Sequence, residues 1–388
     1  MNKAYDVIIV GAGVVGASMA LALAKNTDLN IAIIDSALSK KSSRVSAISP
    51  ASQKWFERLD CWKSIEKKGV SPYTNMYIWD AANQNTMHFD CRSVNASELG
   101  CIIENDIIKE TLLETLLVHS RIDFLNQKIM RFQSREDCII VETENSSTLH
   151  SKLLIGADGA HSFVREQSGI TLKKWHHAPR GAIIATVKTA LPHQKTAWQR
   201  FLPDGPIAFL PLSDCHTSSI VWSCPTEKSH ALMELEESLC CEAIQNAFEN
   251  KLGDITSLSD RQVFSLQTAY AKTTIHPRVA LIGDAAHTIH PLAGMGMNLG
   301  LADAIALSNN IIDAHKKNRD IGSHSTLRRY ERARKTDTLA IIAGIEAIHA
   351  LFSTDDKKIE AIRSIGWKGI DRCSFVKNFL VRVAMGEI

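Results

Sequence analysis

The chain has 388 residues, of which 45% are hydrophobic and 22% charged, values ordinary for a globular protein long enough to form two domains. Its 44 basic and 42 acidic residues nearly cancel, so charge gives no argument for nucleic-acid binding. The nine cysteines include no C-x-x-C pair, and we expect reduced thiols in a cytoplasmic compartment rather than a disulfide framework or a metal site.

An uncharged run over residues 7–24 is long enough to suggest a membrane helix. Three glycines interrupt the run and Asp6 precedes it, so a buried strand, a glycine turn and a buried helix explain it better. We therefore expect no membrane-spanning segment.

The N-terminus predicts a complete βαβ unit. Its strand, helix and second strand are expected over residues 5–10, 14–25 and 31–34. The turn Gly11-x-Gly13-x-x-Gly16 would place a diphosphate at the helix N-terminus, where unpaired N–H groups favour negative charge. Asp35 ends the second strand, where a carboxylate can accept hydrogen bonds from a ribose. Such glycines also serve helix–strand packing, but the complete unit favours nucleotide binding.

The rest of the chain predicts an interrupted α/β fold. We expect one helix that ends at Leu59, a second helix over residues 105–117 and strands over 122–156. A strand-rich stretch follows, and at residue 278 a strand begins that resembles those of the N-terminal βαβ unit. We predict a Rossmann-type domain, an inserted strand-rich (α+β) substrate domain and a helical C-terminal segment. The expected division assigns 1–75, 101–170 and 276–325 to the first, 76–100 and 171–275 to the second, and 326–388 to the third.

Two further glycine–carboxylate pairs follow predicted strands. One is Gly156-Ala-Asp158-Gly159-Ala-His-Ser162-x-Val164-Arg165, and the other is Gly283-Asp284. In isolation, each is also explained as a turn that caps a strand end. However, Gly283 is the first of four glycines within 18 residues, which favours close approach of a ligand. Ligands bind beyond the carboxyl ends of strands in open α/β sheets, so one long ligand is expected to touch this segment and the N-terminal turn.

The order of these three constellations resembles that of the single-component flavoprotein aromatic hydroxylases of the para-hydroxybenzoate hydroxylase fold. More narrowly, four stretches are similar to the UbiH-type ubiquinone-biosynthesis hydroxylases. They are Arg44-Val-Ser-Ala-Ile-Ser49, Leu99-Gly-Cys-Ile-Ile-Glu-Asn105, residues 200–212 and Ala384-Met-Gly386. The resemblance covers essentially the whole chain.

The resemblance implies FAD as a tightly held cofactor and NAD(P)H as a transient co-substrate. The first glycine turn would hold the pyrophosphate, Asp35 the adenosine ribose, and Asp284 the ribityl or pyrophosphate side. Asp158 and Arg165 match a motif associated with both FAD and NAD(P)H contact. The residues thus expected at the cofactor are Gly11, Gly13, Val15, Gly16, Asp35, Ser36, Arg44, Asn105, Asp158, Arg165, Gly283, Asp284, Pro291, Gly294, Gly296, Met297 and Asn298.

One position departs from the family pattern. The family usually has Ala-Gly-Gln-Gly over residues 293–296, and here position 295 is Met. Because both flanking glycines remain, flavin binding is expected to survive, while a polar contact near the flavin or substrate is lost. No side chain is singled out as a catalytic base, and the expected flavin-facing loop comprises Pro291, Gly294, Met295 and Gly296.

Three weaker features each permit two interpretations. His287 and His290 suggest a metal or acid–base role, but no third ligand is evident and a structural role in the loop is favoured. The basic run over residues 328–335 fits anionic lipid headgroups or a partner, and also an ordinary solvated helix face. Four aromatic residues of the insert either line an apolar pocket or form the insert's own core. They are Trp198, Phe201, Phe209 and Trp222.

The activity implied by the resemblance is hydroxylation of the phenolic ring of a polyprenylated substrate on the route to ubiquinone, with NAD(P)H and O2. Such a chain would take its lipid from the inner membrane face or from a partner protein of a ubiquinone-biosynthesis complex. Two alternatives keep every FAD motif: a flavin monooxygenase acting on a soluble aromatic compound, and a non-catalytic flavin-binding member of a biosynthetic complex. An NAD-dependent dehydrogenase would leave Gly283-Asp284 unexplained.

Overall fold

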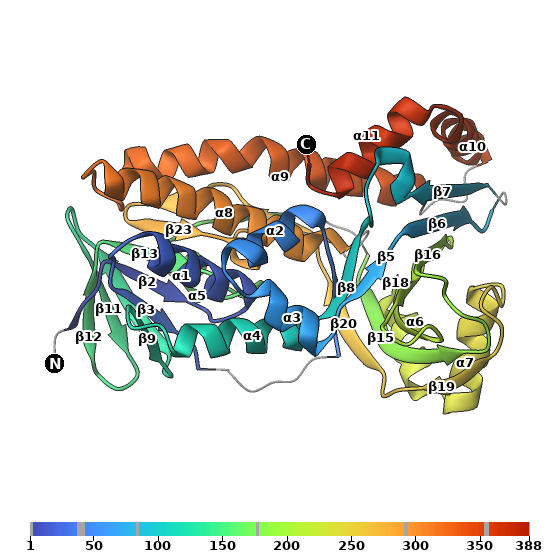
Figure 1. The fold of residues 1–388 in the computed structure, drawn as a ribbon, viewed down its shortest axis with the longest axis horizontal. Helices are drawn as coiled ribbons and strands as arrows, with labels where there is room; N and C mark the ends of the chain where they lie inside the picture. The colour runs from blue at the N-terminus through green and yellow to red at the C-terminus, as the bar shows by residue number, and fades with distance from the viewer. Residues whose placement is uncertain are drawn as a thin grey trace.

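The computed structural model describes residues 3–36, 43–82, 85–175, 178–290, 294–352 and 357–387. One half of the molecule, on the left in Figure 1, is built on a six-stranded sheet. Its order is β22 (Ile275–His276), β23 (Val279–Leu281), β13 (Leu153–Gly156), β2 (Val7–Val10), β3 (Ile31–Ile34) and β9 (Ile122–Leu125). All neighbours pair in parallel except β22, which runs antiparallel to β23. The central strands β2, β3 and β13 contain no charged residue because both of their faces are buried.

The two faces of this sheet are covered differently. Val7 and Ile9 point to one side, where they pack with three helices, α1 (Val14–Asn26), α4 (Asn105–Leu117) and α8 (Met295–Lys316). Ile8 and Val10 point to the other side and pack against a four-stranded sheet. Its strands are β1 (Lys3–Ala4), β12 (Thr148–Ser151), β11 (Ile139–Thr143) and β10 (Ile129–Ser134).

An eight-stranded, mostly antiparallel sheet forms the other half (Figure 1). Its order is β19 (Ile255–Leu258), β15 (Arg180–Thr189), β18 (Thr217–Pro225), β17 (Ile207–Pro211), β16 (Thr196–Phe201), β6 (Asn75–Asp80) and β7 (Thr86–Asp90), with β20 (Gln262–Leu266) paired to β15. The parallel pair β6–β16 joins two segments of the chain that are distant in sequence, with Tyr77 opposite Trp198. Two helices, α6 (Thr226–Glu234) and α7 (Glu237–Ala247), belong to the same half.

Smaller elements connect the halves. One three-stranded sheet consists of β4 (Val45–Ile48), β8 (Gly100–Glu104) and β5 (Ser71–Tyr73), and a second of β14 (Leu172–Lys174), β21 (Ala269–Ala271) and β24 (His287–Thr288). The remaining short helices are α2 (Pro50–Arg58), α3 (Trp62–Lys68), α5 (Phe163–Gln167) and the 3-10 turns η1 (Cys91–Val94) and η2 (Gly283–Ala285). Helix α2 begins after Ser49 because the Ser49 side chain accepts from the Ser52 amide and a proline occupies the first turn.

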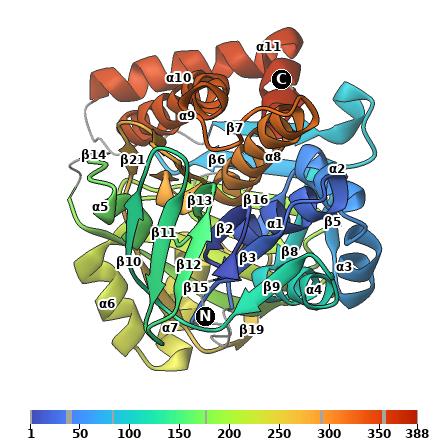
Figure 2. The same ribbon diagram turned by 90° about the vertical axis from the view of Figure 1, so that its left-hand side faces the viewer.

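Three helices close the chain along one side of the molecule, the top of both Figure 1 and Figure 2. They are α9 (His324–Phe352), α10 (Lys357–Arg372) and α11 (Ser374–Ala384). The expected fold class, a Rossmann-type domain with a strand-rich insert and a helical C-terminal segment, is confirmed. The exact domain boundaries stay a prediction. Among the residues that the structure describes, no helix combines the length and apolarity needed to cross a bilayer.

Candidate active site

The three glycine–carboxylate constellations meet at one edge of the six-stranded sheet. Strands β2, β13 and β23 are parallel neighbours, so their carboxyl ends deliver Gly11, Ala157 and Ile282 to the same side. This edge is where an open α/β sheet binds its ligand. The expectation that distant motifs converge is therefore met by strand order alone.

The three glycines of the first turn have different roles. Gly11 has a φ of +103°, and a Cβ there would lie 2.3 Å from the carbonyl oxygen of Ala157. A Cβ on Gly16 would lie 2.0 Å from the carbonyl oxygen of Gly11, so this glycine allows α1 to pack tightly on the turn. A Cβ on Gly13, by contrast, would meet nothing within 4 Å. Gly13 is the residue that leaves space for a ligand.

Gly13 is also the N-cap of α1, and it provides no side-chain cap. The first amides of a helix have no partner within the helix, so a diphosphate can accept their hydrogen bonds at this position. Asp35 stands beside the turn and accepts a 2.7 Å hydrogen bond from the Ala12 amide. The carboxylate therefore stabilises the turn. Its contact with a ribose stays a prediction, as does the contact of the following Ser36 with the cofactor.

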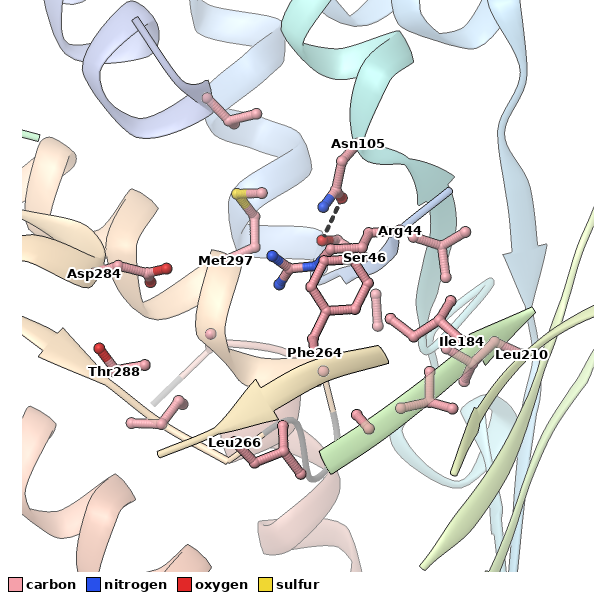
Figure 3. A pocket seen from close by; sticks show the side chains of 18 of the residues that line it. Arg44, Ser46, Asn105, Ile184, Leu210, Phe264, Leu266, Asp284, Thr288 and Met297 are labelled. Atoms are coloured by element: carbon pink, nitrogen blue, oxygen red, sulfur yellow. Dashed lines mark hydrogen bonds between the residues drawn. The ribbon is translucent and has the colours of Figure 1, made fainter. Parts of the chain in front are cut away.

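Arg44 and Asn105 are 61 residues apart in sequence but lie together because β4 pairs with β8. The Asn105 amide donates to the Arg44 carbonyl oxygen across 2.9 Å. The Asn105 side-chain oxygen accepts a 2.6 Å bond from the Ser46 hydroxyl (Figure 3). The Arg44 guanidinium lies 5.2 Å from the ring centre of Phe264 on β20, which orients it at the cavity wall.

Asp158 and Arg165 form the hydrogen bonds that stabilise the second glycine–carboxylate motif, residues 156–165. Asp158 accepts from the Ser162 hydroxyl at 2.5 Å and from the Val164 amide at 3.0 Å, which is a capping arrangement. Burial raises the pKa of Asp158, and these hydrogen bonds oppose the rise. The buried Arg165 guanidinium donates to the carbonyl oxygens of Ala160 and Ala285 and so ties this loop to η2. Neither side chain is among the described residues that line the cavity, and their contact with FAD or NAD(P)H stays a prediction.

The second glycine–aspartate turn opens directly into the cavity. Gly283 has a φ of +62° and turns the chain after β23. The Asp284 side chain is exposed to the cavity (Figure 3), yet it lies well inside the molecule. Withdrawal from bulk water raises its pKa, and the charges of His287 and Arg44 partly oppose the rise.

A buried ion network supports this turn. Asp303 of α8 accepts from the Gly283 amide at 3.1 Å, from His287 Nε2 at 2.6 Å and from Arg334 Nε of α9 at 2.9 Å. Burial by itself would lower the pKa of His287, but the Asp303 charge and hydrogen bond raise it overall. Burial would raise the pKa of Asp303, and its two cationic partners lower it overall.

The histidines of this loop have structural surroundings. His287 belongs to the network with Asp303, and the His290 ring lies 5.7 Å from the ring of His349 on α9. In the described ranges, no group of three His, Cys, Asp or Glu side chains has an arrangement that could hold a metal ion.

The loop before α8 reaches the cavity through its glycines. Gly294 is left-handed at φ +63°, and a Cβ there would lie 2.8 Å from Cβ of Ala47. Gly294, Gly296 and Met297 line the cavity, whereas Met295 is not among the described lining residues. Asn298 accepts from the Ser49 amide and donates to the Ala47 carbonyl oxygen, so it fastens α8 to β4. Pro291, expected in this loop, lies outside the described residues.

These elements line a cavity of about 600 Å³, a size typical of ligand sites. Figure 3 shows Asp284 and Thr288 at one end and the apolar Ile184 and Leu210 at the other. The cavity thus runs from the nucleotide-type edge, which includes Gly13, Val15 and Gly283, to the eight-stranded sheet. One end is suited to polar groups and the other to an apolar ligand.

The sheet wall of the cavity is made by residues that the sequence did not single out. On β15, β17 and β18 the cavity side carries small or aliphatic residues, and the opposite side of β17 and β18 carries the aromatic Phe209 and Trp222. The cavity side includes Ala182, Ile184, Ala208, Leu210 and Val221. Alternation marks these two faces in the sequence, but nothing in the sequence says which one faces the ligand.

The four aromatic residues of the insert are core residues. Phe209 stacks on Phe248 with ring centres 3.8 Å apart, and Trp198 and Trp222 pack in the same cluster beneath α6 and α7. Phe201 packs instead in a separate cluster with Phe352 and Trp367 of the C-terminal helices. The insert's own core is therefore the correct interpretation for Trp198, Phe209 and Trp222, whereas Phe201 packs between the insert and the C-terminal helices.

A helix N-terminus open to a diphosphate, continuous with an apolar wall, fits a flavin dinucleotide with its ring directed toward a second, apolar ligand. The open space at Gly13 is the observation that tests this fit, because any side chain there would occupy it. The protein is therefore of the flavin-dependent oxidoreductase class.

Comparison with known proteins gives the family. The model of the FAD binding domain family matches residues 4–343. The mitochondrial ubiquinone biosynthesis monooxygenase COQ6 of Danio rerio is 33% identical, over 99% of this chain and 90% of that protein. The 3-demethoxyubiquinol 3-hydroxylase of Escherichia coli K12 is 30% identical, over 99% of both chains. The crystal structure of p-nitrophenol 4-monooxygenase from Pseudomonas putida superposes with a TM-score of 0.82 at 19% identity, over 98% of this chain and 97% of that one.

The chain belongs to the family of FAD-dependent monooxygenases that contains the ubiquinone-biosynthesis hydroxylases. FAD is its cofactor.

Proposed function

We propose that the protein hydroxylates the aromatic ring of a polyprenylated phenol in ubiquinone biosynthesis, with NAD(P)H as electron donor and O2 as oxidant. In this reaction one oxygen atom enters a ring C–H bond and the other leaves as water, while NAD(P)H is oxidised. Bound FAD supplies the redox chemistry, and the protein supplies binding, orientation and exclusion of water. The two relatives named above are described as a monooxygenase and a hydroxylase of this pathway.

The observation that carries the proposal is the apolar wall at one end of the cavity. Ala208, Leu210 and Val221 present hydrocarbon from adjacent strands, and Figure 3 shows Leu210 at the end of the cavity opposite Asp284 and Thr288. A substrate held against this wall would bury its ring next to the cofactor edge. Apolar surroundings would also keep bulk water from the reacting ring.

Hydrogen bonding at the sheet wall is supplied by neutral groups. Gln199 and Ser223 face the cavity from the sheet, and burial raises the pKa of the nearby Tyr73, which stays protonated at neutral pH. The described lining residues contributed by the eight-stranded sheet include no charged side chain. We therefore assign these residues to orienting a neutral phenol through its hydroxyl group rather than to ionising it.

We place this activity in the cytoplasm, at the inner face of the membrane, where a prenylated substrate would be available. The odd number of cysteines, with no C-x-x-C pair, supports a reducing compartment. Alternatively, a partner protein in a ubiquinone-biosynthesis complex would deliver the prenylated substrate to the same cavity.

Genetic complementation tests the proposal. The chain would be expressed in bacterial strains blocked at each ubiquinone ring-hydroxylation step, and quinones and accumulated intermediates identified by mass spectrometry. We expect restoration at one step by the wild type and none by Asp284→Ala at matched protein levels. If the FAD-loaded protein restores no step, the ubiquinone assignment is wrong. Turnover of a soluble phenol by such a protein would then support the soluble-substrate alternative, and a lack of phenol-dependent NAD(P)H oxidation the non-catalytic one.

A further inference from the structure

Exposed apolar side chains are concentrated on the C-terminal helices. Of the twelve large hydrophobic residues exposed in the described part of the chain, seven lie between residues 348 and 380. They are Ile348, Leu351, Ile365, Phe375, Val376, Phe379 and Leu380. Single exposed apolar residues are normal, but a concentration of this kind marks an interaction surface.

Helix α11 shows the pattern most clearly. Phe375 is 82% exposed and Phe379 is 47% exposed, and with Val376 and Leu380 they share one face at helical spacing. The opposite face carries Val381, which is buried. The helix is therefore apolar on its inner side and again on its outer side.

These helices are fixed to the body of the protein by their inner faces. On α10, Arg363 forms a 2.8 Å ion pair with Asp80 of β6, and both side chains are almost fully buried. On α11, Val381 packs in a cluster with Cys91 and Leu99. The exposed outer faces thus belong to anchored helices.

The same region is basic. Residues 357–387 contain seven basic and three acidic side chains, and since Arg363 is neutralised by the buried Asp80, the segment carries a net charge of +3 toward its surroundings, whereas the whole chain carries only +2. The rest of the molecule is therefore net negative. Lys357 and Arg382 are among the exposed basic side chains of this segment.

Helix α9 continues the pattern along the same side of the molecule (Figures 1 and 2). Arg329 and Arg332 are exposed in its first half, and Ala340, Ala347 and Leu351 are exposed in its second half. Because their separations are close to whole numbers of helical turns, these positions lie along one stripe of the helix. The basic run noted in the sequence lies in the first half of this helix, and the exposed small and apolar side chains lie in its second half, next to α10.

We propose that α11, with α10 and the second half of α9, binds the surface of an anionic lipid bilayer and lies in its interfacial plane. Apolar side chains on one face with Lys and Arg beside them are the features by which amphipathic helices bind such membranes. Two copies of the chain meeting through this surface would bring two net positive segments together, whereas an anionic bilayer complements the charge.

The inner sides of the helices that carry the proposed membrane surface pack against residues of the cavity wall. Tyr73 and Met76 line the cavity and also pack in the cluster that contains Val381. Ile289 lines the cavity and packs in the cluster that contains Trp367 of α10. This part of the inference rests on the proposed function: docking would hold the cavity beside the bilayer, where the prenyl tail of the substrate resides.

Vesicle flotation of the FAD-loaded full chain tests the proposal. Phosphatidylcholine vesicles would be compared with vesicles that also contain phosphatidylglycerol, with wild type, Phe375→Ser/Phe379→Ser and Arg382→Gln. The matched control is Leu117→Ser/Val118→Ser, because these residues are 63% and 84% exposed at the end of α4. We expect wild type and the control pair to bind the anionic vesicles. The phenylalanine pair should lower the partition coefficient at least about tenfold, and Arg382→Gln about fivefold.

Three results would overturn the proposal. They are no binding of wild type to anionic vesicles, equal losses in the control pair and the phenylalanine pair, and concentration-dependent self-association that the phenylalanine pair abolishes. The last result, measured by sedimentation velocity, would identify a second copy of the chain as the occupant.

Turnover separates this inference from the proposed function. Phe375→Ser/Phe379→Ser should oxidise NAD(P)H with a tail-less phenol at the wild-type rate and lose turnover only with a long-tailed substrate in vesicles. Activity without vesicle binding would refute the membrane surface alone. Vesicle binding without hydroxylation of any phenol would refute the proposed function alone.

Discussion

Substituting two glycines of the same turn should separate ligand binding from packing. A Cβ on Gly13 meets no protein atom within 4 Å, and φ there is an ordinary −67°. Gly13→Ala should therefore cost the apoprotein only about 0.5–1 kcal/mol of unfolding free energy, which is the range for alanine at a helix N-cap. The methyl group would, however, occupy the space at the helix N-terminus where the FAD diphosphate accepts amide hydrogen bonds.

The expected loss of FAD affinity follows from those bonds. A hydrogen bond to a charged group contributes about 1.5–3 kcal/mol, and each 1.4 kcal/mol is a factor of ten in affinity. Gly13→Ala should weaken FAD binding about tenfold to a hundredfold. Gly16→Ala should instead destabilise the fold by about 3 kcal/mol, because its Cβ would lie 2.0 Å from the Gly11 carbonyl oxygen.

Two measurements on each variant check this reasoning. Urea unfolding of the apoprotein, followed by circular dichroism, gives the stability, and titration of flavin fluorescence gives the FAD affinity. The reasoning is refuted if Gly13→Ala binds FAD as tightly as wild type, or if Gly16→Ala leaves the apoprotein fully stable.

Three other expectations concern the network beneath the turn and the cavity wall. Asp303→Asn should lower the unfolding free energy by about 3 kcal/mol or more, since it leaves Arg334 and His287 without their buried carboxylate; urea unfolding measures this. The stability gap between wild type and this variant should be widest between the ordinary aspartate and histidine pKa values of 3.8 and 6.5. This stability gap should shrink as pH rises through the raised pKa of His287, because the imidazole then loses its proton. It should also shrink as pH falls through the lowered pKa of Asp303, because the carboxylate is then protonated. A stability gap that is constant with pH would contradict this reasoning. Ala208→Trp should fill the apolar end and lower kcat/KM for the phenol about a hundredfold while FAD affinity changes less than about twofold; a loss of flavin instead would show that this wall contacts the cofactor.

The nucleotide half could be predicted because its signals are local and repeated. Helix α4 spans Asn105–Leu117, as its periodicity predicts, and β3 spans Ile31–Ile34. Parallel strands deliver their carboxyl ends to one edge, so the convergence of Gly13 and Asp284 follows from recognising the strands that precede them. The pairing of Arg44 with Asn105 did not follow from the residues alone, since it depends on β4 pairing with β8; it entered through family resemblance.

The substrate wall could not be predicted, because both faces of the inserted sheet are apolar. Ala208 and Phe209 are adjacent on β17, yet one lines the cavity and the other is buried beneath α7. The aromatic residue drew attention because of its size, but size here marks the face that packs on helices. Only the positions of α6 and α7 decide which face is left for a ligand.

The buried network had one sequence signal that was not used. Asp303 lies in the apolar run Leu301-Ala-Asp-Ala-Ile305, which is part of α8, and a carboxylate at a buried helix position requires a partner. Its cationic partner Arg334 is 31 residues away on another helix, among several other basic residues. The need for a partner could be inferred from sequence, but its identity required the packing of α8 against α9.

Met295, where the family usually has glutamine, has a different significance once its position at the start of α8 is known. The helix begins at Met295, and residues two positions apart on a helix point about 200° apart. Because Met297 lines the cavity, the side chain at 295 is directed to the other side of the helix. What this stretch presents to the cavity is therefore Gly294, Gly296 and the thioether of Met297. A substitution at 295 would act on a ligand chiefly through the start of α8, so the substrate preference is better sought in Met297 and the sheet wall than in the missing glutamine.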